Sequence, residues 1–330
     1  MAEPVAVLGA GSWGTALAIQ LARGDSPVRL WGHDPGLIGQ LVQERENSKY
    51  LPGFELAPNI QPEASLAKAV AGCKYLLVAI PSKGFRDLLQ DLKPELDDSM
   101  GLFWASKGFE IDTGLLLHEI VEGELPGFRY GVVSGPTFAS EVARGLPAAI
   151  ACAGNHEETT AAFAERLRGH HFRAYTTSDI VGVELGGALK NVLAIAVGVA
   201  DGLGFGANTR AVLMTRGLAE VMRLSTSLGA QQETMMGLAG LGDFILTCTD
   251  NQSRNRRFGL AIGQGKTIEQ AEIEVEQTVE GLRAARAIHD KAMQLGLDLP
   301  IIEEVYRVLY EGKNPQDAVR DLEKRPQGHE

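Results

Sequence analysis

A glycine-rich turn near the N-terminus restricts the fold of this chain more than any other stretch. The run GAGSWG lies between the apolar stretch Val5–Leu8 and a segment of helical character that begins at Thr15. In such a strand–turn–helix unit Gly9 makes the turn, Gly11 lets the backbone approach a pyrophosphate, and Gly14 lets helix and strand pack closely. The N–H groups that begin the helix then bind the pyrophosphate. The stretch predicts a dinucleotide-binding fold.

The tip of the next predicted strand bears on the choice of dinucleotide. The strand Val28–Gly32 is followed by His33 and by Asp34, which lies about 20 residues after the last glycine, where a ribose-binding acid is expected. His33 occupies the tip itself, and an imidazole tolerates a ribose 2′-phosphate better than a carboxylate does. Arg29 and Arg45 are also near in sequence. The sequence therefore leaves NAD, NADP or both open.

Strands and helices continue to alternate through the first half of the chain. Apolar runs predict strands at 75–80, 101–105, 130–133, 147–152 and 172–175, and helical patterns lie at 85–92, 115–121 and 157–167. Such alternation is typical of a mostly parallel sheet that is covered by helices on both faces. We therefore predict an α/β, doubly wound, Rossmann-like domain.

Ligands of such a sheet bind outside the carboxyl ends of its strands. Three predicted strand ends draw attention for this reason, at residues 80–82, 106–108 and 134–139. Lys107 follows a buried strand and precedes a glycine, so its ammonium can point into the ligand crevice. The alternative is that Lys107 is a solvated loop charge.

The second half of the chain is predicted to be helical. Strand patterns end at Asp179, a candidate N-cap, and amphipathic patterns follow at 208–228, 279–295 and 301–310. We expect two domains: residues 1–180 as a Rossmann domain that binds NAD(P), and residues 181–330 as an all-α domain that binds substrate and carries the catalytic group.

The apolar segment Gly182–Ala200 reads as a buried helix, too short and too interrupted to span a membrane. Lys190 and Asn191 are the exceptions within it. Burial lowers the pKa of an ammonium group toward the range that is useful for proton transfer. Alternatively, the Lys190 stem lies on apolar surface and its head reaches water.

Two further stretches carry candidate binding groups. The glycine-rich loop at 237–243 ends in Asp243, which either caps a helix or acts in the site, where it orients the Lys190 ammonium or accepts a substrate hydroxyl. The run 251–257 holds three arginines with Ser253, Asn251 and Asn255, and arginine forks suit phosphate. That run is an anion-binding candidate, and the alternative is a solvated basic turn.

The charge balance makes such a local cluster necessary for an anionic ligand. The chain has 31 Lys and Arg against 42 Asp and Glu, a formal charge of −11. This argues against nucleic acid or an anionic membrane as a partner. Because Cys73, Cys152 and Cys248 are odd in number and far apart, we expect no disulfide framework and a reducing cytosol. We also expect no metal and no export signal.

Seven motifs, in the right order along the chain, resemble those of the NAD(P)-dependent glycerol-3-phosphate dehydrogenases of the bacterial type. They are residues 9–16, 31–34, 106–108, 134–139, 189–191, 240–243 and 253–255. The resemblance implies hydride transfer between NAD(P)H and dihydroxyacetone phosphate to give sn-glycerol 3-phosphate. It also implies a role in glycerophospholipid synthesis and a cytoplasmic enzyme that is commonly a homodimer.

The resemblance further implies individual roles, with Lys190 as the general acid/base. The implied substrate-binding residues are Lys107, Gly135, Thr137, Lys190, Asp243, Ser253, Arg254 and Asn255. The implied cofactor-binding residues are Gly9, Gly11, Ser12, Trp13, Gly14, His33, Lys107, Ala139, Arg254, Thr278 and Glu280. Trp13 stands where the family more often has a smaller aromatic residue, and Thr278 where an aliphatic residue is usual. From spacing alone, Glu280 is either a helix cap or a cofactor contact.

Two other functions fit the same patterns. One is a related two-domain dehydrogenase that acts on a 3-hydroxy acid or a sugar-phosphate acid. The other is a non-catalytic dinucleotide sensor, which would bind cofactor without turnover and would have no use for a buried lysine.

Overall fold

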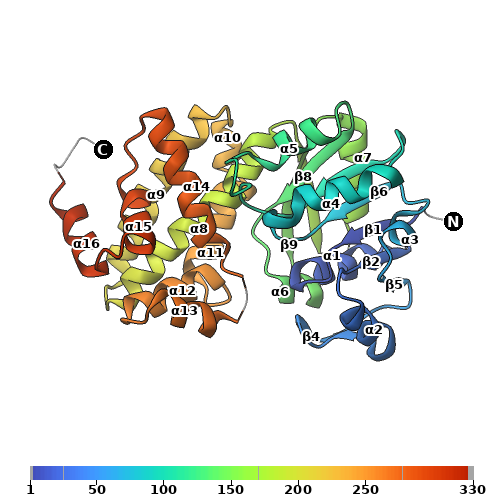
Figure 1. Cartoon of the computed structure of the whole chain (residues 1–330), viewed down its shortest axis with the longest axis horizontal. Helices are drawn as coiled ribbons and strands as arrows, with labels where there is room; N and C mark the ends of the chain where they lie inside the picture. The colour runs from blue at the N-terminus through green and yellow to red at the C-terminus, as the bar shows by residue number, and fades with distance from the viewer. Residues whose placement is uncertain (1–2, 25, 170, 277, 326–330) are drawn as a thin grey trace. The chain divides into compact units, whose positions relative to one another are not determined.

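The computed structural model describes residues 3–325 except 25, 170 and 277, and the chain divides into two compact units (Figure 1). Unit 1 comprises Met1–Glu110 and Leu115–Glu184, and unit 2 comprises Ile111–Gly114 and Leu185–Glu330. The chain passes from one unit to the other within helix α8 (Ile180–Gly202).

Unit 1 is built on an eight-stranded sheet with the strand order β10-β9-β8-β7-β6-β1-β2-β5. Neighbouring strands are parallel except β8 and β9, which are antiparallel. The predicted fold class, a mostly parallel Rossmann-like sheet followed by a helical part, is confirmed. The strands are β1 (Val5–Leu8), β2 (Val28–Trp31), β5 (Ile60–Glu63), β6 (Tyr75–Val78), β7 (Gly101–Trp104), β8 (Arg129–Ser134), β9 (Ala148–Gly154) and β10 (Phe172–Thr177).

The central strands are short apolar runs because helices cover them. All four residues of β1, β6 and β7 are buried. Phe103 of β7 stacks on Phe163 of α7 with ring centroids 4.0 Å apart. The helices of unit 1 are α1 (Ser12–Ala22), α2 (Pro35–Glu44), α3 (Leu66–Val70), α4 (Phe85–Leu92), α5 (Leu117–Glu124), α6 (Ala139–Arg144) and α7 (Glu157–Leu167), with the 3₁₀ turns η1 (Ser82–Gly84) and η2 (Lys93–Glu95).

Three strands were not predicted. They are β5 at the edge of the main sheet and the separate antiparallel pair β3 (Glu46–Asn47) and β4 (Leu51–Glu55). The sequence of β5 is IQPE, and only Ile60 in it is buried. A strand at a sheet edge can be polar and can contain proline, so it lacks the apolar run by which the other strands are recognised.

Unit 2 is helical, as predicted. Its elements after α8 are α9 (Ala207–Ser227), α10 (Gln232–Met235), the π-helical turn η3 (Leu238–Gly242), α11 (Asp243–Thr249), α12 (Arg254–Gly263), α13 (Ile268–Val275), α14 (Glu280–Leu295), α15 (Pro300–Tyr310) and α16 (Pro315–Glu323). Among the described residues, α8 has the length and apolar composition to cross a membrane, but 83% of its most apolar window is buried. It is therefore a core helix. Asp179 accepts a hydrogen bond from the Gly182 N–H at 2.9 Å, as expected of a cap.

The predicted glycine-rich loop at 237–243 is instead a π-helical turn that runs directly into α11. Close packing explains its glycines. A Cβ at Gly240 would lie 2.0 Å from the Met235 carbonyl oxygen, and one at Gly186 of α8 would lie 2.3 Å from that of Ala239. The turn therefore packs backbone to backbone on α8, and this packing fixes where α11 begins.

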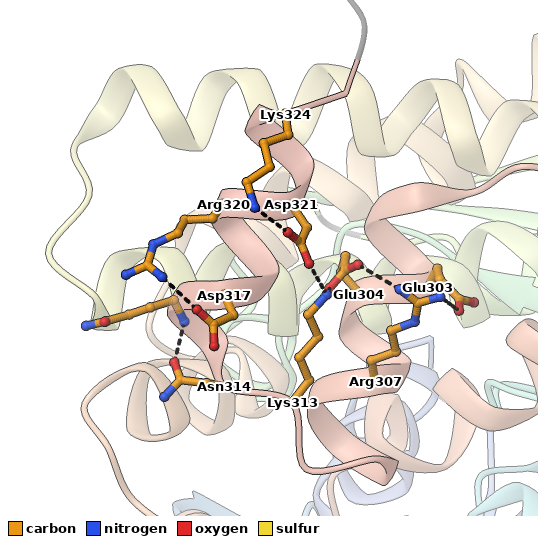
Figure 2. Close-up of polar contacts among 10 residues, drawn as sticks. Glu303, Glu304, Arg307, Lys313, Asn314, Asp317, Arg320, Asp321 and Lys324 are labelled. Atoms are coloured by element: carbon orange, nitrogen blue, oxygen red, sulfur yellow. Dashed lines mark hydrogen bonds and ion pairs between the residues drawn. The ribbon is translucent and has the colours of Figure 1, made fainter.

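Ion pairs link the last helix, α16, to α15 (Figure 2). The Lys313 ammonium lies 2.6 Å from Glu304 of α15 and 2.7 Å from Asp321 of α16. Within α16 itself only Ala318 is buried. These ion pairs therefore accompany a small apolar contact between α16 and the rest of unit 2.

A buried carboxylate joins α9 to α15 and makes the stability of unit 2 depend on pH. Glu220 is 2% exposed and accepts hydrogen bonds from the N–H groups of Ile301 (2.8 Å) and Ile302 (3.1 Å). Burial raises the pKa of Glu220 to about 7, although these hydrogen bonds and Arg223 oppose the shift. Folded protein therefore binds more protons than unfolded protein between pH 4.5 and about 7. The free energy of unfolding falls by about 3 kcal/mol across this window as pH rises.

Glu220→Gln is expected to remove this contribution. The free energy of unfolding, measured with urea, should rise for the variant relative to wild type as pH is raised from 5 to 8. The exposed Glu233 of α10 supplies the control, since Glu233→Gln should leave the pH dependence unchanged. If the free energy of unfolding depends on pH in the same way for Glu220→Gln and wild type, Glu220 does not titrate in this range.

Candidate active site

The glycine turn between β1 and α1 has the geometry that pyrophosphate binding requires. Gly9 has φ +130°, and a Cβ on it would lie 2.5 Å from the Ala79 carbonyl oxygen. A Cβ on Gly14 would lie 1.8 Å from the Gly9 carbonyl oxygen, so close packing requires glycine there. A Cβ on Gly11 would meet nothing within 4 Å. Open space therefore lies at Gly11, the glycine at which the fingerprint lets the backbone approach the pyrophosphate.

The start of α1 leaves its N–H groups for a ligand. The N-cap residue is Gly11, which has no side chain to bond them, and the first turn of this fully described helix contains no acidic residue. Ser12 and Trp13 begin the helix and are partly exposed. A helix N-terminus without a side-chain cap suits an anion, so the residues present fit a dinucleotide.

The tip of β2 differs from a ribose-binding arrangement in one respect. The Asp34 carboxylate accepts hydrogen bonds from the N–H groups of Gly36 (2.9 Å) and Leu37 (3.3 Å), so it caps α2. His33 is exposed beside it. The acid expected at this spacing thus serves a helix, and His33 is the exposed side chain at the strand tip.

The two arginines near β2 in sequence are committed to backbone carbonyls. Arg29 donates to the carbonyl oxygens of Lys68 (2.9 Å) and Ala71, next to α3. Arg45 donates to those of Leu56 (3.0 Å) and Ile60 (2.9 Å). Each guanidinium group holds a loop in place through one terminal nitrogen, and a contact with a 2′-phosphate stays a prediction.

The ends of β7 and β8 place four predicted residues in unit 1. Lys107 follows β7 by three residues and is half-buried, and Gly108 after it has φ +113°. Gly135 directly follows β8, and the Thr137 hydroxyl donates to its carbonyl oxygen at 3.2 Å. Ala139 begins α6. All four lie just past the carboxyl ends of sheet strands, where ligands of this fold bind.

Lys190 is buried at the centre of unit 2, with 8% of its surface exposed. Its ammonium lies 2.5 Å from Asp243 Oδ1 and donates to the Thr247 hydroxyl at 2.8 Å. Thr247 in turn donates to the Asp243 carbonyl oxygen at 2.6 Å. Of the two interpretations of Asp243, contact with Lys190 is the one observed: the N-cap of α11 is Gly242, and Asp243 is the first residue of the helix.

A second polar group surrounds Asn191, the neighbour of Lys190. The Asn255 amide donates to Asn191 Oδ1 at 2.9 Å, and its own oxygen accepts from the Gly281 N–H at 2.8 Å. The Asn191 amide donates to Glu280 at 3.4 Å. The structure thus brings the predicted residues Asn255 and Glu280 together beside the helix that carries Lys190.

The basic run 251–257 divides among different environments. Ser253 caps α12 by accepting from the Arg256 N–H at 3.2 Å, and Arg254 begins that helix, half-buried. Arg256 is buried, and Arg257 is exposed. Thr278 is exposed ahead of α14.

Thr247 was not among the predicted residues. It lies four residues after Asp243, and residues so spaced are neighbours on a helix surface, so an assignment of α11 would have found it.

The geometry of unit 2 is suited to proton transfer. In the part of the chain that the structure describes, no group of three His, Cys, Asp or Glu residues could hold a metal ion. A cavity of about 640 Å³ between α14, α15 and α16 is lined by none of the predicted residues. A buried ammonium fixed by a carboxylate can stabilise and protonate a developing alkoxide.

The Rossmann-like sheet, its glycine turn and the helical unit that follows place the chain among two-domain dinucleotide-binding proteins. Comparison with family models is more specific. Residues 4–160 match the model of the NAD-dependent glycerol-3-phosphate dehydrogenase N-terminus, and residues 179–320 match that of its C-terminus. The chain therefore belongs to the NAD-dependent glycerol-3-phosphate dehydrogenase family.

Individual relatives agree. The chain is 51% identical to a glycerol-3-phosphate dehydrogenase [NAD(P)+] of Thioalkalivibrio sulfidiphilus, over 97% of this chain and 96% of that one. It is 51% identical to one of Nitrosococcus oceani, over 97% and 94%. A crystal structure of glycerol-3-phosphate dehydrogenase from Coxiella burnetii superposes with a TM-score of 0.95 at 43% identity, covering 98% of this chain and 99% of that one.

Proposed function

We propose that the protein interconverts dihydroxyacetone phosphate and sn-glycerol 3-phosphate with NAD(H) or NADP(H). The observation that carries the proposal is the buried contact between Lys190 and Asp243, in a chain whose 51% identical relatives are glycerol-3-phosphate dehydrogenases [NAD(P)+]. A buried amine held by a carboxylate suits an enzyme that moves a proton.

We assign the dinucleotide to unit 1. Gly9, Gly11 and Gly14 shape the turn, and the first N–H groups of α1, at Ser12 and Trp13, face the pyrophosphate. When bound, the nicotinamide dinucleotide supplies the hydride for the ketone or accepts it from the alcohol. The predicted cofactor contacts of His33, Lys107, Ala139, Arg254, Thr278 and Glu280 belong to the same proposal.

We assign the proton transfer to unit 2. As the ketone is reduced, its oxygen gains negative charge, and the Lys190 ammonium stabilises that charge and gives up a proton. In the opposite direction, neutral lysine removes the hydroxyl proton. Asp243 and Thr247 hold the amine in position. Ser253, Arg254 and Asn255 at the start of α12 bind the substrate phosphate, and Lys107, Gly135 and Thr137 complete the set of substrate contacts.

The glycine turn allows a test of dinucleotide binding that is separate from folding. Gly11→Ala adds a methyl group to open space at φ −79°, an ordinary value for alanine. We expect an unchanged thermal midpoint and about 10-fold weaker dinucleotide binding in a fluorescence titration, because the methyl group blocks pyrophosphate approach.

Gly14→Ala is the contrasting variant. Its methyl group would clash with the Gly9 carbonyl and should destabilise the fold by about 1–3 kcal/mol. Unchanged dinucleotide binding by a folded Gly11→Ala protein would place the cofactor elsewhere.

The proposed activity is tested by the loss of reduced-nicotinamide absorbance when dihydroxyacetone phosphate is added to enzyme with NADH or NADPH. Turnover is expected to be much faster with this substrate than with dihydroxyacetone at equal concentration. Faster oxidation of NADH or NADPH with a 3-keto acid, or faster reduction of NAD+ or NADP+ with a sugar-phosphate acid, would instead identify the related two-domain dehydrogenase. Cofactor binding without any turnover would identify a sensor.

Three further assignments rest on the family. We propose a cytoplasmic location, a homodimer and the supply of glycerol 3-phosphate for phospholipid synthesis. Light scattering on the purified protein would measure its mass in solution. A mass of 35.3 kDa, which is that of one chain, would exclude the dimer.

A further inference from the structure

Helices α8 and α12 are in direct backbone contact. A Cβ added to Gly198 of α8 would lie 2.2 Å from the Arg256 carbonyl oxygen, and one added to Gly202 would lie 2.3 Å from that of Leu260. In the other direction, Cβ atoms on Gly259 and Gly263 of α12 would each lie 2.2 Å from a carbonyl oxygen of α8. Residues four apart share one face of a helix, so the four glycines form one contact strip. The strip sets the position of α12 on the helix that carries Lys190.

Next to the strip, Asp201 near the end of α8 pairs with two arginines, the buried Arg256 and the partly exposed Arg210. Its Oδ2 lies 2.5 Å from Arg256 Nη2, and its Oδ1 lies 2.9 Å from Arg210 Nη2 of α9. The side chains of Asp201 and Arg256 are 8% and 9% exposed. Each oxygen of the Asp201 carboxylate is paired with a different arginine. Asp201 is therefore not a ligand for substrate.

Arg256 also holds the turn that precedes α12. Its other terminal nitrogen, Nη1, donates to Asn251 Oδ1, and its backbone N–H donates to the Ser253 hydroxyl at 3.2 Å. The conformation of residues 251–256 therefore depends on Arg256, and the position of Arg256 depends on Asp201. This turn presents Ser253, Arg254 and Asn255, the proposed phosphate-binding residues.

We propose that Asp201 and Arg256 are positioning residues, which hold the start of α12 in the geometry that binds the substrate phosphate. The proposal rests on the function proposed above and assigns different roles to three neighbouring arginines. Arg254 contacts the phosphate, Arg256 fixes the turn from inside, and Arg257 is solvated. Neither Asp201 nor Arg256 touches the reacting atoms, so their effect is expected on substrate affinity and not on the chemical step.

The test compares Asp201→Asn and Arg256→Lys with the matched control Arg257→Lys. Asn keeps the size of Asp201 and removes its charge, and Lys keeps the charge of Arg256 and removes the fork that reaches two partners. Both variants are expected to raise KM for dihydroxyacetone phosphate about 10-fold, because small displacements of binding groups have large effects, with kcat within about twofold of wild type. Arg257→Lys should match wild type.

Unphosphorylated dihydroxyacetone separates positioning from general damage. It lacks the group that the turn binds, so its kcat/KM should be the same in wild type, Asp201→Asn and Arg256→Lys. Equal loss for both substrates, or no loss for either, would overturn the proposal. If Asp201→Asn fails to fold, Arg256→Lys decides the question alone. The two hypotheses fail differently: wild-type enzyme inactive on dihydroxyacetone phosphate refutes the proposed function, whereas active wild type with unaffected variants refutes only this inference.

Discussion

Lys190→Met is expected to lower kcat for dihydroxyacetone phosphate reduction by about three orders of magnitude, the typical size of a general acid/base contribution. Methionine is close to lysine in length and suits the apolar surroundings of α8, so it removes the proton donor with little change of volume. Dinucleotide affinity should stay within about twofold of wild type, because the glycine turn belongs to unit 1. Steady-state kinetics and a dinucleotide titration measure the two effects.

The matched control is Lys68→Met on α3, which removes an exposed ammonium. It should leave kcat unchanged. Near-normal turnover by Lys190→Met would exclude Lys190 as the proton donor. Equal losses of turnover and of dinucleotide affinity would instead indicate general disruption of the protein.

Asp243→Asn is expected to reduce the free energy of unfolding by about 3 kcal/mol or more. Asp243 is 1% exposed and supplies the charge that offsets the Lys190 ammonium, which lies 2.5 Å away. With asparagine the ammonium loses that partner in a buried site, and the variant should also lose most of its turnover. Urea unfolding and initial rates measure both.

Two companion variants test why Asp243→Asn should lose stability. Lys190→Met combined with Asp243→Asn contains neither charge, so it should be more stable than Asp243→Asn alone while remaining inactive. Thr247→Val loses only a neutral hydrogen-bonding group and should cost about 1 kcal/mol. If the double variant is no more stable than Asp243→Asn, the uncompensated charge is not what destabilises the protein.

The sheet could be read from the sequence because its central strands are buried on both faces. Burial selects short apolar runs such as YLLV in β6, and their length and the turn residues that flank them favour a strand over a buried helix. The strand β5 has no such run, since an edge position tolerates Pro62 and Gln61. Glycine roles were also predictable, because a turn, a close approach and a helix contact each have a fixed place in the fingerprint.

Side-chain orientation is where sequence reasoning fell short. Arg29 and Arg45 have the right charge and the right neighbourhood for a 2′-phosphate, yet both bind carbonyl oxygens. Asp34 has the expected spacing, and its Oδ1 caps α2. Residue type and spacing specify what a side chain can bind. Packing decides whether the side chain binds the backbone or a ligand.

The contact between Lys190 and Asp243 shows the same limit over a longer range. The two residues are 53 positions apart and belong to different helices. The sequence offered this pairing as one of two alternatives, and only the packing of η3 on α8 places the carboxylate beside the amine.

The glycine strip between α8 and α12 has a consequence for how substrate choice can change in this chain. The spacing between the amine and the turn before α12 is set by the absence of side chains, and even a single added methyl group would force the two backbones apart. We therefore expect a change of substrate size to be accommodated in the turn at residues 250–255 and not in the spacing of the two helices. The four glycines thus fix the distance between α8 and α12, whereas the turn at residues 250–255 is under no such constraint.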